Sequence, residues 1–388
     1  MDLPEQASVV IIGGGVMGTS IAFHLAEAGV RDVLLLEQAQ LGSGSTCKAA
    51  GGVRAQFSDP VNIALGWRGL AAFEDFPTRP GQVIDLHQPG YLFLLTSPDE
   101  LEVYAESVAL QNAMGVPSVM LTPEQAAALS PAVVTGDVLG AAFHARDGYC
   151  SPESVVLGYA TGARRHGATI RTGVTVTGIE RNGDDIVAVR TDQGSVRTST
   201  VVCAAGPWSA EIGDFAGVSL PVSPLRRQIL ITEALNDELA ALMPPTMPMT
   251  IDASTTFYLH REGPGILLGM SYRGEQPGFH LDYSEEWLAD LMSAIDARCP
   301  ALLDVGIAHR WSGLYEVTPD HNALIGESTG VSRFLYATGF SGHGFLQGPA
   351  VGEVIRDLYL GHEPVVDVAP LSVKRFVDGG FRGEVNIV

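Results

Sequence analysis

The sequence predicts a mixed α/β fold of two domains, in which the second domain interrupts the chain of the first. Two observations predict it. The chain has 388 residues, more than a single hydrophobic core of roughly 250–300 residues accommodates. A strand, a glycine-rich turn and a helix follow one another near the N-terminus and again near the C-terminus. If both units belong to one sheet, the chain between them supplies the inserted domain.

The N-terminal unit is the clearest. Residues 9–12 predict a buried strand, residues 13–18 a glycine turn, and the stretch after them a helix that ends at Gly29. Glycine is typical of helix ends because it adopts the left-handed conformation at no steric cost. A second strand is expected over residues 33–36, directly before Glu37.

The middle of the chain predicts short β segments, and the C-terminal part returns to strand and helix. Turn sequences at residues 182–185 and 192–194 separate the expected strands. The other expected elements are strands at 175–181, 186–191, 195–198, 201–204 and 334–337, and helices at 285–298 and from about 347 to 360.

Composition disfavours several classes of function. The net charge is −21, with 44 acidic against 23 basic residues, which opposes binding to nucleic-acid phosphates or to an anionic membrane. No apolar run approaches the roughly 18 residues of a membrane span, and no secretory leader is recognised, so we expect a cytoplasmic location. Cys47, Cys150, Cys203 and Cys299 are widely spaced and predict neither a metal site nor a disulfide framework.

The strongest local motif lies in the N-terminal turn. Gly13, Gly15 and Gly18 occupy the three positions of GxGxxG between a strand and a helix. The first glycine permits the tight turn, the second admits a pyrophosphate, and the third lets helix and strand pack closely. Glu37, at the end of the second strand, is placed to accept hydrogen bonds from a ribose. This Rossmann-type arrangement predicts a dinucleotide site.

A second small-residue loop follows that site. Residues 42–54 read GSGSTCKAAGGVR, and small side chains there leave room for a further ring of a cofactor. A dehydrogenase that binds NAD alone usually returns directly to a helix at this point. The loop therefore favours FAD, with an NAD-only dehydrogenase as the alternative.

At this point the sequence resembles a known family, the flavoenzymes that include D-amino-acid oxidase, glycine oxidase and sarcosine oxidase. The likeness covers nearly the whole chain and rests on GGGVMG, LLLE, GSGSTCKAAGG, VVCAAGPWS, GLYEVTPDHNALIG and ATGFSGHGF. It is nearest to the β subunits of heteromeric sarcosine oxidases and related imino-acid dehydrogenases.

The resemblance implies a fold similar to p-hydroxybenzoate hydroxylase, with an antiparallel-sheet substrate domain inserted into the FAD-binding domain. The FAD-binding domain is expected over 1–85, 145–224 and 312–388, and the substrate domain over 86–144 and 225–311. The implied cofactor contacts are Gly13, Gly15, Val16, Met17, Gly18, Glu37, Gln38, Ser45, Thr46, Lys48, Ala49, Gly51, Gly52, Val174, Ala205, Gly206, Gly313, Gly339, Gly342, His343, Gly344 and Phe345.

The same resemblance implies residues at the substrate. Arg54 matches an arginine that grips the substrate carboxylate, Tyr315 matches an active-site tyrosine, and Tyr258 is a further candidate on the substrate sheet. For Arg54 an ordinary surface arginine is the alternative, and for His343, a possible donor to the flavin, a structural histidine in a glycine turn. Arg226 and Arg227 either add positive charge or make an interdomain or subunit contact.

Departures from the family pattern define what is expected to differ. Gly313 stands where some members have a flavin-linking cysteine, and Lys48 where others have the linking histidine of STWHAAG, so non-covalent FAD is expected. Leu267 replaces a lysine that activates oxygen, and Leu346 a lysine that helps bind the carboxylate. Lys48 either compensates near the flavin or is structural.

These features predict oxidation of the C–N bond in a small amino acid or N-substituted amino acid of the sarcosine, proline or glycine-derivative type, by hydride transfer to flavin N5. The expected acceptor is oxygen, a quinone or a partner subunit, and homo- or hetero-oligomers are possible. The alternatives are a β-type subunit of a heteromeric imino-acid dehydrogenase and a flavin-binding protein with a structural or regulatory role.

Overall fold

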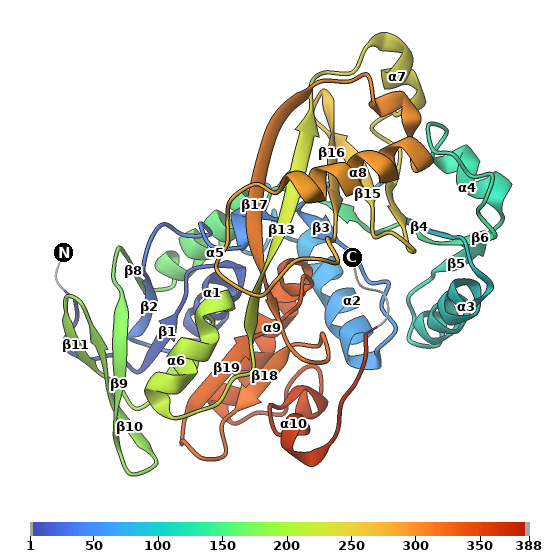
Figure 1. Cartoon of the computed structure of the whole chain (residues 1–388). Helices are drawn as coiled ribbons and strands as arrows, with labels where there is room; N and C mark the ends of the chain where they lie inside the picture. Colours follow the sequence, from blue (N-terminus) through green and yellow to red (C-terminus); the bar gives the residue numbers. More distant parts are fainter. Residues whose placement is uncertain (1–2, 385–388) are drawn as a thin grey trace.

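The computed structural model describes residues 3–384 and contains two large sheets (Figure 1). The first has six strands in the order β18-β19-β12-β1-β2-β8. Its strands are β1 (Val9–Ile12), β2 (Val33–Glu37), β8 (Thr169–Thr172), β12 (Val201–Cys203), β18 (Leu324–Glu327) and β19 (Phe334–Thr338). Both ends of the chain thus contribute to one sheet, as the repeated strand–turn–helix unit predicts.

The strands of this sheet are parallel except for β18, which pairs antiparallel with β19. Side chains alternate across the sheet. Val9 and Ile11 face a core shared with helices, whereas Val10 and Ile12 face a second core. The helices on the first face are α1 (Val16–Glu27), α5 (Pro152–Arg165) and α9 (Gly344–Leu360), with α2 (Pro60–Glu74) against α9.

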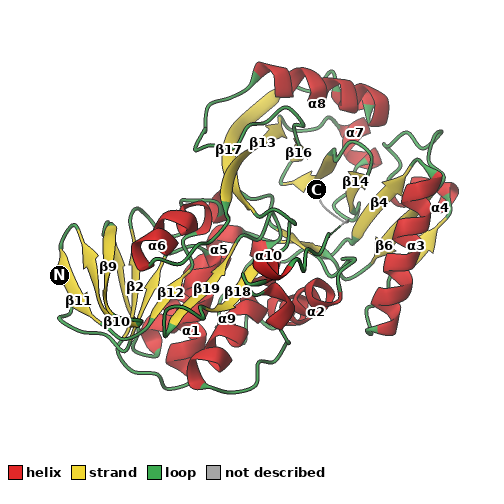
Figure 2. Ribbon diagram, turned by 60° about the horizontal axis from the view of Figure 1, so that its bottom comes forward, coloured by secondary structure: helices red, strands yellow, loops and turns green. Residues whose placement is uncertain are grey.

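The second face is covered by a small antiparallel sheet and one short helix. The sheet comprises β9 (Val176–Asn182), β10 (Asp185–Thr191) and β11 (Gly194–Arg197), and the helix is α6 (Ser209–Ala216). Figure 2 shows these three strands beside the six-stranded sheet, at the end of the molecule where the N-terminus of the chain lies. The predicted hairpin strands are confirmed to within one residue at each end.

The larger sheet has eight strands in the order β17-β13-β16-β15-β14-β4-β6-β5. Its strands are β4 (Tyr91–Leu95), β5 (Val119–Leu121), β6 (Gly140–His144), β13 (Ser223–Thr232), β14 (Met249–Asp252), β15 (Tyr258–Glu262), β16 (Gly265–Met270) and β17 (Ile307–Val317). All of its pairings are antiparallel except that of β14 with β4, which is parallel. The fold is therefore the expected mixed α/β fold with an inserted sheet.

One face of the larger sheet packs against helix α8 (Glu285–Arg298), whose predicted bounds are confirmed. Trp287 and Leu291 of α8 lie over Leu230 and Leu268 of the sheet. The alternate residues, among them Tyr91, Ile229 and Tyr258, form a separate cluster on the other face. That face is turned toward the glycine turn that follows β1.

The remaining elements are short or peripheral. They are β3 (Gly52–Val53), β7 (Gly148–Tyr149), α3 (Pro98–Ala113), α4 (Pro123–Leu129), α7 (Asp237–Leu242) and α10 (Arg375–Asp378). Within residues 3–384, no helix is long and apolar enough to cross a bilayer.

Candidate active site

A single cavity of about 490 Å³ joins the two sheets. At one end it is lined by the glycine turn after β1, the end of β2 and the chain after β12. At the other end it is lined by side chains of β4, β13, β14, β15 and β17. Ligands of α/β sheets bind at the carboxyl ends of the parallel strands. The first end of the cavity lies there, after β1, β2 and β12, where the sequence predicts the dinucleotide.

The glycine turn is built around close backbone contacts. Gly13 has φ +110°, and a Cβ there would lie 2.2 Å from Ala204 O. A Cβ on Gly18 would lie 1.8 Å from Gly13 O, so this glycine serves the close approach of helix to strand. Helix α1 begins after Gly15 with no side-chain cap and no acidic residue in its first turn. Apart from Val16 N, which donates to the Thr46 hydroxyl, the N–H groups of its first turn and its positive dipole end are available to an anion.

Glu37, at the end of β2, fixes the backbone of the glycine turn and of the chain that follows β2. Its carboxylate accepts hydrogen bonds from Gly14 N (2.7 Å) and Ala39 N (2.8 Å), one on each oxygen. The Glu37 carbonyl accepts from Val174 N at 3.0 Å, which fixes Val174 at the cavity wall. Each carboxylate oxygen retains a lone pair that a ribose hydroxyl can use.

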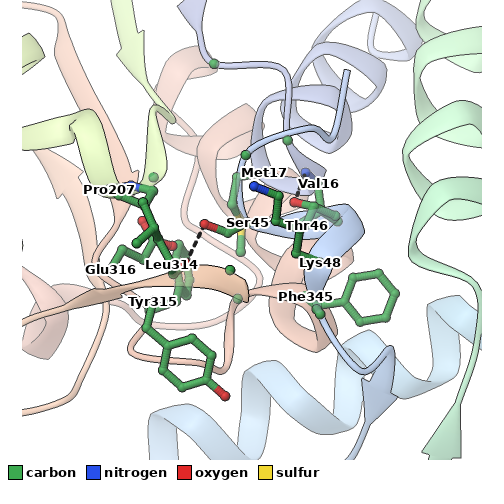
Figure 3. Close-up of a pocket in the computed structure, with 18 of the residues that line it drawn as sticks. Val16, Met17, Ser45, Thr46, Lys48, Pro207, Leu314, Tyr315, Glu316 and Phe345 are labelled. Carbon is green, nitrogen blue, oxygen red and sulfur yellow. Dashed lines mark hydrogen bonds between the residues drawn. The ribbon is translucent and has the colours of Figure 1, made fainter. Parts of the chain in front are cut away.

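The loop of small residues ties the two ends of the cavity together. Ser45 Oγ donates to Leu314 O at 2.6 Å, and Val16 N donates to Thr46 Oγ1 at 3.1 Å. Figure 3 shows Ser45, Thr46 and Lys48 of this loop beside Leu314 of β17. A Cβ on Gly313 would lie 3.0 Å from Lys48 Cβ, so Lys48 packs against the position where some family members have cysteine.

The C-terminal glycine turn brings a second helix terminus to the cavity. Helix α9 begins at Gly344 with His343 as its N-cap, three residues earlier than the predicted start near Gln347. The prediction was wrong because Gly344 and Pro349 weaken the helical pattern, while packing of α9 against α1 and α2 outweighs their low propensity. The first turn of α9 is therefore directed at the site.

His343 is buried, and its ring lies 5.1 Å from that of Phe57 in an edge-to-face contact. Burial, and secondarily the nearby Arg54 cation, hold the pKa of His343 well below its usual range, so the imidazole is neutral. Its Nε2 has no hydrogen-bond partner among the described residues. A buried polar atom without a partner at a cavity wall is the arrangement expected where a ligand completes the site.

At the substrate end, Arg54 is 3% exposed. It donates from Nη1 to Gln56 O, and its guanidinium lies 4.1 Å from the Phe57 ring centre and 5.6 Å from that of Phe93. The surface-arginine interpretation is therefore wrong for Arg54. Burial raises the pKa values of Tyr258 and Tyr315, so both phenols stay protonated at neutral pH.

Among the polar residues that line the cavity, sequence reasoning missed Tyr91 and Glu316 and left the role of Arg227 undecided. Tyr91 of β4 lines the cavity, and a Cβ on Gly52 would lie 1.9 Å from its Oη. Arg227 of β13 lines it as well. Glu316 follows Tyr315 in β17, and the two side chains leave the strand on opposite sides (Figure 3). Its place inside the GLYEVTPD motif was the available signal.

Glu316 is a carboxyl enclosed by donors rather than by a cation. It accepts from Thr338 Oγ1 at 2.9 Å and from Gly339 N at 3.1 Å. Burial raises the pKa of Glu316 to about 7, against the opposing effect of these donors. The carboxyl therefore connects β17 to the glycine turn that precedes α9.

Most of the predicted residues line this cavity. Of the expected set, only Gly18 and Gly339 do not: Gly18 packs against Gly13, and Gly339 has φ +71° behind the cavity wall. Leu267 is buried in β16 and does not line it, whereas Leu346 does. Within residues 3–384 there is no group of three or more side chains suited to hold a metal ion.

These residues fit FAD. The N-termini of α1 and α9, in neither of which the N-cap residue makes a side-chain hydrogen bond, border one elongated cavity, as suits phosphates and the electron-rich edge of a flavin. Glycines and alanines line the middle of the cavity, where a planar ring must pass.

Comparison with known proteins agrees with this fit. Residues 8–358 match the family described as FAD dependent oxidoreductase. Dimethylglycine dehydrogenase, mitochondrial, of Mus musculus is 31% identical over 389 residues, which covers 96% of this chain and 44% of that protein. The chain thus spans less than half the length of this relative.

Two solved structures are similar over nearly their whole length. L-proline dehydrogenase from P. horikoshii is 32% identical with a TM-score of 0.91, and the match covers 98% of this chain and 100% of that one. Glycine oxidase from Geobacillus kaustophilus is 25% identical with a TM-score of 0.84, over 96% and 99% of the two chains.

Proposed function

The chain belongs to the FAD-dependent oxidoreductase family, and we propose that it oxidises the C–N bond of a small amino acid or N-substituted amino acid. The proposal rests on one observation. The glycine turn that would hold the dinucleotide and a group of polar and aromatic side chains that would hold the substrate line the same cavity. Arg54, Tyr258 and Tyr315 stand at that substrate end, where a carboxylate-bearing amine requires both charge and hydrogen-bond donors.

The names of the similar proteins support the same substrate class. Dimethylglycine dehydrogenase, L-proline dehydrogenase and glycine oxidase are named for a tertiary, a secondary and a primary amino acid. All three substrates pair an amine with a neighbouring carboxylate.

FAD, when bound, supplies the two-electron oxidant that takes a hydride at N5 from the carbon next to nitrogen. The chain's own residues must orient the substrate and favour its neutral amine. The walls formed by Tyr91, Tyr258 and Met249 are buried, and desolvation lowers the pKa of an amine. Because Tyr258 and Tyr315 stay protonated, they act as donors or orienting groups and not as bases near neutral pH.

We further propose that FAD is held without a covalent bond, since Gly313 and Lys48 replace the residues that form one in related proteins. Ser45, Thr46 and the turn at Gly342 would hold the cofactor with the residues around Gly13. We also propose that the protein is cytoplasmic.

A second candidate function is a β-type subunit that passes electrons to partner subunits or to a quinone instead of oxygen. Leu267, where the family resemblance implies an oxygen-activating lysine, favours it, and it is buried in β16. Lys48, at the cavity wall, is the one cavity-lining lysine of the described residues and the only candidate to replace that function.

The test is anaerobic mixing of the purified yellow protein with glycine, N-methylglycine, N,N-dimethylglycine and proline, followed by admission of air. Loss of the flavin's visible absorbance with at least one of them is expected. Fast return of colour in air would indicate an oxidase, and slow return the electron-transferring alternative. Bound FAD that no amine reduces, in the presence of any co-purified subunits, would contradict the proposal.

A further inference from the structure

Arg227 has no role in the family resemblance, yet it occupies the substrate end of the cavity. We propose that Arg227 is the primary anchor for the substrate carboxylate and makes the site specific for amines that carry one. This inference rests on the proposed function, and it differs from the family pattern, which assigns the carboxylate to the position of Arg54.

The strand places Arg227 on the cavity side. Side chains of β13 alternate, and Arg226 and Gln228 point the other way: Arg226 Nε pairs with Glu275 at 2.9 Å, and Gln228 Oε1 accepts from Ser284 N at 2.8 Å. Arg227 and Ile229 line the cavity. Opposite Arg227 in β17 stands Gly313, which has no side chain to cover the guanidinium.

The guanidinium of Arg227 is incompletely satisfied. Its one hydrogen bond within residues 3–384 runs from Nη1 to Arg226 O at 3.0 Å, and Cζ lies 4.8 Å from the centre of the Tyr315 ring. Nε is enclosed and has no partner, and no carboxylate of the described residues pairs with the group. Burial lowers the pKa of Arg227, although a guanidinium stays charged in proteins.

A half-buried cation without an anionic partner at a cavity wall is a candidate site for a ligand anion. The second terminal nitrogen of the guanidinium has no hydrogen bond within residues 3–384 and, unlike Nε, is not enclosed, so it can donate hydrogen bonds to a substrate carboxylate. Stacking on Tyr315 fixes the plane of the guanidinium and so the direction of those bonds.

Arg54 is arranged differently. It is almost fully buried, donates to Gln56 O, and lies against the rings of Phe57 and Phe93. These contacts hold its side chain within the protein wall. Arg54 therefore serves mainly to shape the pocket and add positive potential, whereas Arg227 presents hydrogen-bond donors.

The surroundings of Arg227 define where the amine lies. Tyr258 crosses the neighbouring strand at Gly269, where a Cβ would stand 2.2 Å from its ring, so the phenol lies flat over the sheet. Ile229 and Met249 line the same wall. A substrate held by its carboxylate at Arg227 thus places its amine between aromatic and apolar side chains, while an amide or alcohol analogue leaves the cation uncompensated.

The experiment compares wild type with Arg227→Gln and Arg227→Lys. Proline and prolinamide are each titrated under anaerobic conditions, and the apparent Kd for flavin reduction is measured. Arg227→Gln should weaken proline binding by about 10- to 100-fold, as expected for loss of a charged hydrogen-bonding partner, and leave the prolinamide value unchanged. Arg227→Lys should recover part of the loss.

The matched control is Arg310→Gln. Arg310 lies on the adjacent strand β17, over the Tyr283 ring at 4.2 Å, but is exposed outside the cavity. It should change neither titration. Equal weakening of proline and prolinamide by Arg227→Gln, or no weakening of either, would overturn the proposal.

A readout without turnover separates this inference from the proposed function. Pyrrole-2-carboxylate, a planar carboxylate analogue of proline, is titrated into the holoprotein and followed by flavin absorbance and calorimetry. Binding that weakens with Arg227→Gln supports the anchor even if no amine reduces the flavin. The Tm of Arg227→Gln should not fall, because the substitution removes a half-buried charge that has no anionic partner. A lowered Tm with unchanged ligand binding would assign Arg227 a structural role.

Discussion

Gly18→Ala tests the glycine turn of residues 13–18 at its closest backbone contact. A Cβ there would stand 1.8 Å from Gly13 O, against 3.4 Å for an ordinary contact, so helix α1 must move by about 3.4 − 1.8 = 1.6 Å. A hydrogen bond of about 2.9 Å does not survive such a displacement. If two bonds from α1 to the pyrophosphate are lost, at about 1.5–3 kcal/mol each for a charged acceptor, FAD binding weakens by about 10²–10⁴-fold.

The assay is the ratio of flavin to protein absorbance after desalting, followed by titration of the apoprotein with FAD. Alanine is the better helix former by about 1 kcal/mol, so any loss comes from the clash and not from helix propensity. Gly29→Ala is the control: Gly29 has φ +87° at the other end of α1, with open space around its Cβ. It should lower stability and leave FAD content unchanged. Full flavin content in Gly18→Ala would refute the reasoning.

Two further predictions concern the site. The pKa of Glu316 is raised from 4.5 to about 7 in the folded protein, so the folded state favours the protonated carboxyl. The stability that this protonation contributes is complete below pH 4.5 and is lost as pH rises through 7. Unfolding free energy from urea titrations should fall by up to roughly 3 kcal/mol over that window, and Glu316→Gln should abolish this component; an identical slope in the variant would contradict it. Acid precipitation should release all FAD into the supernatant, and a yellow pellet would reveal a covalent bond.

Local signals predicted much of the fold. The strand before Gly13, the end of α1 shortly before Gly29 and the bounds of α8 follow from short-range patterns that tertiary contacts do not override. The start of α9 was predicted too late, since its first turn depends on packing against other helices. Likewise, the parallel pairing of β14 with β4 joins segments more than 150 residues apart, which no local pattern indicates.

The residues of the site also fall into those that local patterns identify and those that depend on tertiary structure. Residues within the glycine motifs were identified because turn geometry requires particular residue types at fixed spacing. Tyr91 and Arg227 were not assigned, because the face that a strand residue presents depends on sheet register and on what covers the other side. Arg226 and Arg227 are neighbours in sequence, yet one forms an ion pair with Glu275 and the other lines the cavity.

The central claim is that this cavity oxidises an amino acid at the carbon next to nitrogen. The most direct measurement is anaerobic flavin reduction by proline and by proline deuterated at the carbons bonded to nitrogen, with N-methylglycine and its deuterated form in parallel. The account predicts complete loss of flavin colour with at least one pair, and slower loss with the deuterated form. No loss of colour with any amine, or a rate indifferent to deuterium because another step transfers the electrons, would contradict it.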